Sequence, residues 1–399
     1  MNETLENALP LAGIRVIALE QAVAAPFATR QLADLGAEVI KIERSGSGDF
    51  ARGYDENVRG QSSHFVWLNR SKRSLTLDLK SSRGLEILER LLAGADVLIQ
   101  NLAPGALDRL GFATERLRRD HPRLIVANLS GYGLSGPYVT KKAYDLLVQA
   151  ESGFLSITGT PDAPSKAGIA VADIAGGMYA YSGVLTALLS RARTGRGTAF
   201  EVSLLEALGE WMGYPAYYAG YGGAAPQRTG GAHATIAPYG PFPTADGKTL
   251  LLGLQNDREW AAFCEKVLER PDMKHDPRFA TNAQRVANRA ELDARIAELC
   301  REKPLDTLMA HLDACGIANG QLREMQDFLN HPQLEARDAW QEVGTPNGPI
   351  WAMRPPVRME GVTPRFDAIP AVGGDTDTIL GELGYSEAAV RELRTAGII

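Results

Sequence analysis

The feature that most constrains the fold is the alternation of short apolar runs with helical patterns along the first third of the chain. Residues 13–44 contain the run IRVIAL, then PFATRQLADLG with helical spacing, then AEVIKIE, which together predict a strand, a helix and a strand. A second unit begins with LTLDL at residues 75–79 and continues through RGLEILERLLAG to ADVLIQN, and RLIVANLS from Arg123 adds another strand. This alternation predicts an α/β fold with a mostly parallel, doubly wound sheet, which binds ligands near the carboxyl ends of its strands.

Later segments indicate a second, smaller lobe. Residues 173–193 are apolar on almost all sides, which is typical of a buried helix, and TGRG ends it. The stretch that ends in AYYAGYGG is expected to be a linker, with a boundary near Tyr221. PYGPFPTADGKTLLLGL predicts a β-hairpin, followed by a helix with a capping-box-like start at Asn288 and a helix closed by Gly316. We therefore expect a large Rossmann-like α/β domain in residues 1–220, a small α+β domain in residues 221–330, and a return segment in residues 331–399 that completes the large domain.

Charge and composition exclude several partners. The net charge is −6, and no stretch gathers Lys and Arg into a stripe with stacking aromatics, so nucleic acid is not an expected partner.

The opening MNETLENALP is polar and acidic, and no run of about 18 apolar residues occurs, so we expect a cytoplasmic protein without a membrane span. Cys264, Cys300 and Cys315 are scattered without a CxxC pair, which supports neither disulfides nor a zinc site.

Three segments hold residues suited to ligand binding, and each also has a plainer interpretation. GYGLSGP at residues 131–137 matches GxGxxG after a strand, but no dinucleotide-type helix follows, so we interpret it as a tight glycine loop beside a site. Arg44 follows the second strand, where an arginine either binds a ribose phosphate, such as the 3′-phosphate of coenzyme A, or is a solvated strand end. His233 has no partner readable from the sequence, so we assign it at most a minor role in positioning substrate.

Asp173 stands between an extended apolar segment and the apolar helix. It is either a helix cap or a carboxylate that the helix dipole keeps ionised, as a nucleophile requires. Gly176 and Gly177, one turn later, are expected to leave room for a substrate to approach.

Longer blocks resemble the family III coenzyme A transferases, the group that includes formyl-CoA transferase and the α-methylacyl-CoA racemases. The blocks are APFATRQLADLGAEVIKIERSGSGDFAR, LNRSKRSLTLDLK, QNLAPGALDRLG, SGYGLSGP, AYDLLVQAESG, VADIAGGMYA and TGRG, and the likeness extends over nearly the whole chain. The resemblance implies that the Asp173 carboxylate attacks a donor thioester to give a mixed anhydride, and that CoA then forms an enzyme thioester which an acceptor acid discharges. It implies no ATP, no metal and no permanently bound cofactor, with an acyl-CoA and a small carboxylic acid as partners.

The resemblance also implies how chains assemble and where CoA binds. Family members form intertwined homodimers, in which two ring-like chains are interlocked. The residues implied to lie along CoA are Val23, Ala24, Arg44, Leu77, Lys80, Asn101, Arg109, Lys142 and Tyr144.

Departures from the family pattern narrow the activity. The formyl transferase has a glutamine where this chain has Val23, so formate and oxalate are not the expected acids. The racemases have a catalytic histidine where this chain has Tyr144 before Asp145, and tyrosine lacks a pKa near neutrality for proton exchange at an α carbon. We therefore expect succinyl-CoA or a similar donor and a small dicarboxylic acceptor such as malate, mesaconate, itaconate, citramalate or glutarate, with Arg52 or Arg70 holding the distal carboxylate. The alternatives are an acyl-CoA racemase or epimerase and a CoA-binding protein without turnover.

Overall fold

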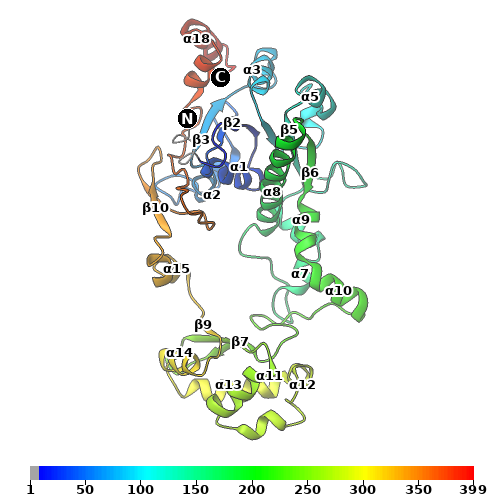
Figure 1. The fold of residues 1–399 in the computed structure, drawn as a ribbon, viewed down its shortest axis with the longest axis vertical. Coiled ribbons are helices and arrows are strands. Elements are labelled where there is room, and N and C mark those ends of the chain that lie inside the picture. Colours follow the sequence, from blue (N-terminus) through cyan, green and yellow to red (C-terminus); the bar gives the residue numbers. More distant parts are fainter. Residues whose placement is uncertain (1–8) are drawn as a thin grey trace. The chain divides into compact units, whose positions relative to one another are not determined.

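The computed structural model describes residues 9–399, which form two compact units (Figure 1). The first unit comprises the chain up to Ser152, Gly168–Met212 and Leu334–Ile399, and the second comprises Gly153–Ala167 and Gly213–Gln333. Within the described residues, no helix is both long and apolar enough to cross a lipid bilayer.

The first unit is built on a six-stranded sheet with the order β3-β2-β1-β4-β5-β6. Every neighbouring pair is parallel, which confirms the prediction of a parallel α/β sheet. The order reverses between β1 and β4, and sheets of this kind bind ligands in the crevice at such a reversal. The strands are β1 (Arg15–Leu19), β2 (Glu38–Glu43), β3 (Lys72–Thr76), β4 (Val97–Gln100), β5 (Ile125–Ser130) and β6 (Ala199–Ser203).

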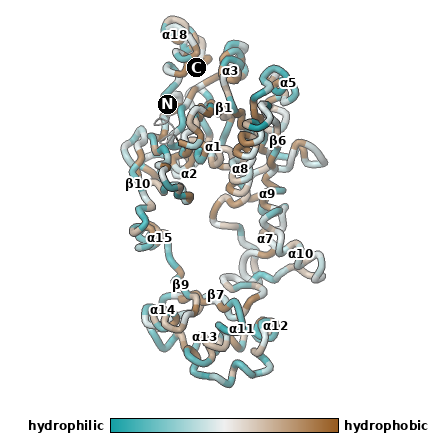
Figure 2. The backbone as a smooth tube through the Cα atoms, in the orientation of Figure 1, coloured by the Kyte–Doolittle hydropathy of each residue, from teal (hydrophilic) through white to brown (hydrophobic). Residues whose placement is uncertain are grey.

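Helices connect these strands and cover the sheet. Ile17 of β1 belongs to a buried cluster with Ile87 and Leu88. Val16 and Ala18 point to the opposite face and are also fully buried, so both faces are covered. Figure 2 colours the backbone of these strands and helices by the hydropathy of each residue. The helices are α1 (Ala24–Asp34), α2 (Ser63–Leu68), α3 (Ser82–Ala93), α4 (Ala106–Arg109), α5 (Thr114–Asp120), α6 (Asp145–Glu151), α8 (Val171–Thr194) and α9 (Leu204–Trp211), with a short 3-10 helix, η1 (Phe50–Gly53).

Strand β3 begins and ends earlier than predicted. The alternation of leucines places a strand at residues 75–79, whereas the structure places β3 at Lys72–Thr76. Lys72 and Ser74 are buried because their side chains donate hydrogen bonds to Glu20 and Glu43. Buried polar residues therefore occupy inward positions of β3, which a hydrophobic pattern cannot reveal.

Helix α8 is buried on one side only, so the expectation that it is buried nearly all round is wrong. Its packing face consists of small residues such as Ala172, Ala175 and Ala180, which are fully buried. Leu189 on the same helix is 70% exposed. The apolar sequence predicted too much burial because small residues of α8 form its packing contacts, whereas large apolar residues such as Leu189 point outward.

The stretch predicted to be a linker leaving the first lobe is largely helical, and the chain passes from the first unit to the second within it, between Met212 and Gly213. It contains β6, then α9, then α10 (Gly213–Gly222), and the Ser203 hydroxyl caps α9 by accepting from the Glu206 N–H. Tyr217 and Tyr221 of α10 are 69% and 89% exposed and stack with ring centroids 6.2 Å apart. A helix with exposed aromatics lacks the one-sided pattern that marks a surface helix, which explains why α10 was not predicted.

The return segment covers one edge of the sheet in the first unit. It forms the antiparallel hairpin β10 (Trp340–Val343) and β11 (Ile350–Met353), and then α17 (Thr376–Glu382) and α18 (Glu387–Thr395). Ile379 and Leu393 of these helices pack in one cluster with Leu75 beside β3. The Ile398 carbonyl also accepts a hydrogen bond of 2.7 Å from the Asp78 N–H.

The second unit contains an antiparallel sheet of β7 (Tyr239–Pro243), β8 (Thr249–Gly253) and β9 (Asn319–Gln321), so the predicted hairpin is confirmed. Trp260, Phe263 and Phe279 are buried at the centre of its core. The remaining elements are α7 (Phe154–Ile157), α11 (Asp257–Ala262), η2 (Phe263–Val267), η3 (Pro271–His275), α12 (Asn282–Ala287), α13 (Arg289–Arg301), α14 (Leu305–Ala314) and α15 (Met325–Leu329), with α16 (Pro332–Glu335) at the boundary of the two units.

Two predicted helix ends in the second unit have different outcomes. Gly316 follows α14 with a φ of 69°, which confirms it as the glycine that closes this helix. Asn288 precedes α13, but its side chain makes no cap bond and donates to the Arg278 and Gln284 carbonyls. The capping box lies one helix earlier, between Thr281 and Gln284 of α12, so the prediction at Asn288 is wrong.

Candidate active site

The carboxyl ends of β1 and β4 hold two of the predicted CoA-binding segments together. Asn101 follows β4, and its amide oxygen accepts from the Gln21 N–H at 2.9 Å while its Nδ2 donates to the Gln21 carbonyl at 2.8 Å. Val23 and Ala24 come directly after this loop at the start of α1, and both are buried. The reversal of strand order therefore brings Asn101 next to the loop that carries Val23 and Ala24.

Asp173 is the third residue of α8, so its interpretation as the cap of this helix is wrong. The Asp145 carboxylate, at the start of α6, caps α8 instead: its Oδ1 accepts from the Ala172 N–H at 2.8 Å and from the Asp173 N–H at 3.4 Å. Gln149 holds the other oxygen of Asp145 at 2.7 Å. Asp145, and not Asp173, therefore accepts the hydrogen bonds at the start of α8. The Asp173 carboxylate makes no hydrogen bond or ion pair with any of residues 9–399.

The surroundings of Asp173 make it a weaker acid than an ordinary aspartate. Burial raises the pKa of Asp173 to about 7, and the nearby charge of Asp145 adds to the effect. The helix dipole alone would keep this carboxylate ionised, but burial and the like charge outweigh it. Asp173 is therefore protonated more readily than an ordinary aspartate, and its carboxylate is more basic than usual.

Tyr54 borders the same site and was not identified from the sequence. Burial, together with the charges of Asp49, Asp173 and Tyr144, raises the pKa of Tyr54 to about 12. Its hydroxyl therefore stays protonated and can donate a hydrogen bond near Asp173. The only sequence signal for Tyr54 is its place directly after the block that ends in GDFAR.

Cations predicted to bind CoA phosphates lie on the surface. Arg44, Lys80 and Lys142 are exposed, and none of them pairs with a carboxylate in the part of the chain that the structure describes. Arg109 is also exposed and donates to the Pro104 carbonyl at 3.2 Å. These side chains are available for a phosphate, although Leu77, the remaining predicted contact after β3, is buried.

The two adjacent lysines of the glycine loop differ in their surroundings. Lys141 pairs with Glu151, and its ammonium lies 4.1 Å from the ring centre of Tyr138 and 5.2 Å from that of Tyr132. Residues 131–137 form turns rather than a helix, as predicted. Lys141 thus fixes the loop internally and leaves Lys142 exposed.

Both arginines predicted to hold a distal carboxylate already bind carboxylates of the protein. Arg52 makes paired hydrogen bonds of 2.9 and 2.7 Å to Glu43. Arg70 makes paired bonds of 2.8 and 2.7 Å to Asp34. Two parallel hydrogen bonds are the strongest way in which an arginine binds a carboxylate. A substrate carboxylate would therefore have to displace Glu43 from Arg52 or Asp34 from Arg70.

His233 lies in the second unit, where its contacts are local. Its ring stacks on Tyr239 with centroids 5.3 Å apart, its Nδ1 accepts from the Thr235 N–H at 3.2 Å, and its carbonyl accepts from Arg289. These contacts order the turn before β7.

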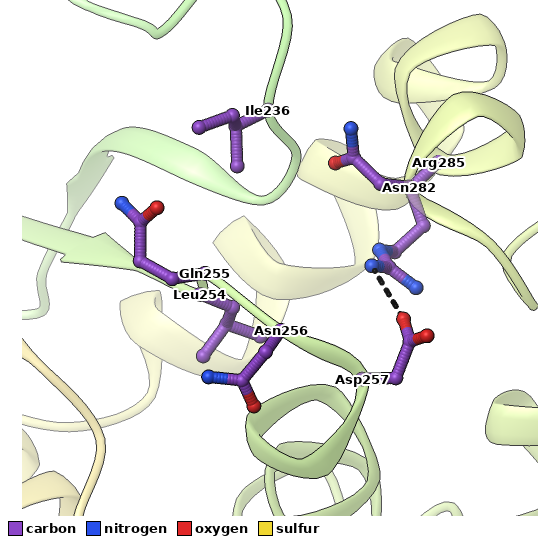
Figure 3. Close-up of a pocket in the computed structure, with 7 residues that line it drawn as sticks. All are labelled: Ile236, Leu254, Gln255, Asn256, Asp257, Asn282 and Arg285. Atoms are coloured by element: carbon purple, nitrogen blue, oxygen red, sulfur yellow. Dashed lines mark hydrogen bonds and ion pairs between the residues drawn. The ribbon is translucent and has the colours of Figure 1, made fainter.

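The second unit also has a surface pocket of about 320 Å³ (Figure 3). Arg285 at its wall is buried, donates to the Ala237 carbonyl at 2.8 Å and lies 3.4 Å from the Asp257 carboxylate. Because protein groups already satisfy this guanidinium, the pocket has no free cation for an anionic ligand. Its other lining residues are Ile236, Leu254, Gln255, Asn256 and Asn282.

Gly176 and Gly177 do not leave room for a substrate, so that expectation is wrong. A Cβ at Gly177 would lie 2.6 Å from the Ala24 carbonyl oxygen, and one at Gly176 would lie 2.4 Å from the side chain of Leu204. The two glycines let α1 and α9 pack closely against α8. Gly177 therefore sets how near Asp173 lies to the start of α1.

We expect Gly177→Ala to lower both stability and activity. The added methyl would meet a backbone atom that cannot rotate away, so α8 must shift from α1, and such overpacking costs about 1–3 kcal/mol. Urea-induced unfolding measures the first effect, and the transferase activity that the resemblance implies measures the second. Gly209→Ala is the matched control, since a Cβ there meets no atom within 4 Å. Equal stability of the Gly177→Ala and Gly209→Ala proteins would contradict the prediction.

Comparisons with known proteins find a matching family model, similar sequences and a similar solved structure. A family model described as CoA-transferase family III matches residues 11–376. A mouse protein named succinyl-CoA:glutarate CoA-transferase is 34% identical over 399 residues, which cover 98% of this chain and 90% of the mouse protein. An Acetobacter aceti protein named acetyl-CoA:oxalate CoA-transferase is 37% identical over 331 residues, 82% of this chain and 85% of that protein. The crystal structure of a CAIB/BAIF family protein from Brucella suis has a TM-score of 0.82 at 34% identity and covers 94% of this chain and 99% of its own.

Proposed function

The chain belongs to CoA-transferase family III, an enzyme family that transfers CoA, and from this premise we propose that it moves CoA from succinyl-CoA to a small dicarboxylic acid through Asp173. The observation that carries the proposal is the state of the Asp173 carboxylate, which lies in the first turn of α8 without a protein partner while Asp145 caps the helix. A carboxylate without hydrogen bonds and with a raised pKa is a better nucleophile than one held in an ion pair.

In the proposed reaction, bonds form and break on three carbonyl carbons, which belong to the donor, Asp173 and the acceptor. An Asp173 oxygen attacks the thioester carbonyl, the C–S bond breaks, CoA leaves as a thiolate, and the donor acyl group stays on Asp173 as a mixed anhydride. The thiolate then attacks the aspartyl carbonyl, which releases the donor carboxylate and leaves CoA as a thioester on Asp173. An acceptor carboxylate attacks that thioester to form a second anhydride, and the expelled thiolate takes the acceptor acyl group and restores Asp173. The donor acid leaves as a carboxylate, the acceptor acid enters as one, and one thioester is exchanged for another, so the proposed reaction needs no ATP, metal or resident cofactor.

Substrate recognition and assembly are parts of the same proposal. The exposed cations and the loop at Val23 support a CoA site, and the name of the mouse relative supports a succinyl donor and a dicarboxylic acceptor. The exposed Leu189, Tyr217 and Tyr221 support burial against a second chain in an interlocked homodimer, since large apolar residues rarely face water in such numbers. We also propose a cytoplasmic location. Roles of Arg52 and His233 toward the acceptor stay predictions. The CoA site would comprise Val23, Ala24, Arg44, Leu77, Lys80, Asn101, Arg109, Lys142 and Tyr144.

Trapping the covalent intermediate tests the proposal. We expect the intact mass of the protein to rise after mixing with succinyl-CoA, by a CoA or succinyl adduct that maps to Asp173 and is absent from Asp173→Ala. Acceptors such as glutarate and oxalate are then ranked by how fast they discharge the adduct. Without an adduct from any of several acyl-CoAs, and with solvent deuterium entering the α carbon of the acyl group, the racemase alternative would replace the proposal.

The rate of adduct formation is expected to follow the ionisation of Asp173. Because burial raises the pKa of Asp173 to about 7, the rate at low succinyl-CoA should rise about tenfold per pH unit below about pH 6 and level off above about pH 8. Asp145→Asn removes the like charge and keeps an oxygen for the Ala172 N–H, so its profile should move to lower pH. Quenched-flow mass measurements at each pH provide the profile. A profile that is flat between about pH 5 and pH 9, or unmoved in Asp145→Asn, would contradict this prediction.

A further inference from the structure

Asp49 is a buried carboxylate whose contacts join two segments of the proposed site. It is 3% exposed and stands between β2 and η1. Its Oδ1 accepts from the Ala22 N–H at 3.2 Å and from the Ala51 N–H at 2.9 Å. Ala22 lies in the loop after β1, and Ala51 lies in η1, so one oxygen atom connects the two segments.

The loop after β1 needs such support because its backbone is strained. Ala22 has a φ of 60°, in the left-handed region that residues other than glycine rarely adopt. Asn101 holds the loop at Gln21 from one side, and Asp49 holds it at Ala22 from the other. Val23 and Ala24, the first residues proposed to contact CoA, follow immediately.

Asp49 is itself fixed from behind by buried charges. Its Oδ2 accepts from the Lys41 ammonium at 2.8 Å, and Lys41 also lies 3.3 Å from a Glu20 oxygen. The Asp49 N–H donates to Glu43 at 2.8 Å. With both oxygens and the backbone engaged, the carboxylate has one orientation.

Helix η1 connects Asp49 to the surroundings of Asp173. Its last residue, Gly53, is followed by Tyr54, whose pKa is raised first by burial and then by the charges of Asp49 and Asp173. Tyr54 therefore lies within electrostatic reach of both carboxylates, and the close packing of α8 against the start of α1 brings the helix that carries Asp173 to the loop after β1.

We propose that Asp49 is a positioning residue for CoA transfer: by hydrogen-bonding Ala22 and Ala51 with one oxygen, it sets the loop after β1 against η1 and so aligns the bound thioester with Asp173. The proposal rests on the proposed function of Asp173. It differs from a role in overall stability because it depends on the accepting oxygen rather than on the charge. Asparagine keeps that oxygen and loses the one that pairs with Lys41, which retains Glu20 at 3.3 Å, whereas alanine removes both oxygens.

The test compares Asp49→Ala with Asp49→Asn in two measurements on the full chain. We expect Asp49→Ala to weaken the binding of CoA, measured by calorimetry, by about tenfold or more, and to slow adduct formation at saturating succinyl-CoA by a similar factor, since small misplacements of reacting groups have effects of this size or larger. Asp49→Asn should restore both values to within about threefold of the parent protein. Where Asp49→Ala does not fold, Asp49→Glu replaces it, because glutamate keeps the charge and displaces the oxygen.

Controls and contrary outcomes separate this proposal from others. Glu38→Gln breaks ion pairs to Arg15 and Arg73 at the opposite end of β2 and should leave both values unchanged. Normal CoA binding by folded Asp49→Ala would overturn the proposal, as would an asparagine variant as defective as the alanine variant, because the charge and not the hydrogen bonds would then matter. CoA affinity is measured without the covalent step, so it tests Asp49 even if the parent protein forms no adduct.

Discussion

Asp173→Asn is expected to lose at least about 10³-fold in CoA transfer, because an amide cannot attack a thioester and no other described carboxylate occupies the same position. The variant keeps the size of the side chain, so the walls of the site should be unchanged. Steady-state turnover with succinyl-CoA and an acceptor acid measures the loss. Glu86→Gln is the matched control, since Glu86 is exposed on α3 and has no ion pair within residues 9–399.

The same substitution is expected to stabilise the protein at alkaline pH. The pKa of Asp173 is about 7 in the folded state and near its ordinary value when unfolded, so the folded protein binds more protons across this interval. The negative charge of Asp173 does not destabilise the folded protein below the pKa of the unfolded state. It has its full destabilising effect above the pKa of the folded state. The free energy of unfolding of Asp173→Asn should therefore exceed that of the parent by on the order of 1 kcal/mol at pH 8, and this difference should shrink toward pH 5. Thermal melts at both pH values check this.

Two results would contradict these expectations. Retention of a tenth of the parental rate by Asp173→Asn would assign the nucleophile to another group. A variant less stable than the parent at pH 8 would mean that the Asp173 carboxylate makes a favourable contact in the folded chain.

Glu20→Gln is expected to have the largest effect on stability. The Glu20 carboxylate is fully buried and accepts from Lys72 at 2.7 Å, from Lys41 at 3.3 Å and from the Thr29 hydroxyl at 2.5 Å. Without it, Lys72 is a buried ammonium with no carboxylate partner. Burial already lowers the pKa of Lys72 to about 8, against the attraction of Glu20. Breaking a buried pair in this way costs about 3–5 kcal/mol.

A second substitution distinguishes the charge from the packing. Urea unfolding of Glu20→Gln should show the loss, and Glu20→Gln combined with Lys72→Met should recover much of it, because the unpaired charge is gone. Glu38→Gln, on the half-exposed side of the same sheet, should cost less than about 1 kcal/mol. If Glu20→Gln unfolded at the parental urea concentration, the buried charges would contribute nothing to the first unit.

Hydrophobic periodicity predicted the frame of the first unit but not its polar interior. The first strand, helix and strand were predicted from the spacing of apolar residues, because these elements bury ordinary apolar faces. Strand β3 was misplaced because Lys72 is buried in an ion pair that sequence spacing cannot show.

The candidate site was predicted in part, for a similar reason. Motif resemblance pointed to Asp173, but that Asp145 caps the helix and leaves Asp173 without a partner depends on two segments 28 residues apart meeting in space. The internal partners of Arg52 and Arg70 are likewise tertiary contacts. Gly177 appeared to be a gap for substrate, and only the distance to Ala24 shows that it is a packing contact.

The cover that α17 and α18 provide over β3 has a consequence for synthesis of the protein. About 300 residues separate β3 from α17, and the whole second unit lies between them. At roughly 5–20 residues per second, a ribosome needs about 15–60 s to make that stretch. During this time Leu75 and its neighbours lack their apolar cover. The nascent first unit therefore exposes an apolar sheet edge, to which chaperones can bind, until translation reaches the end of α18.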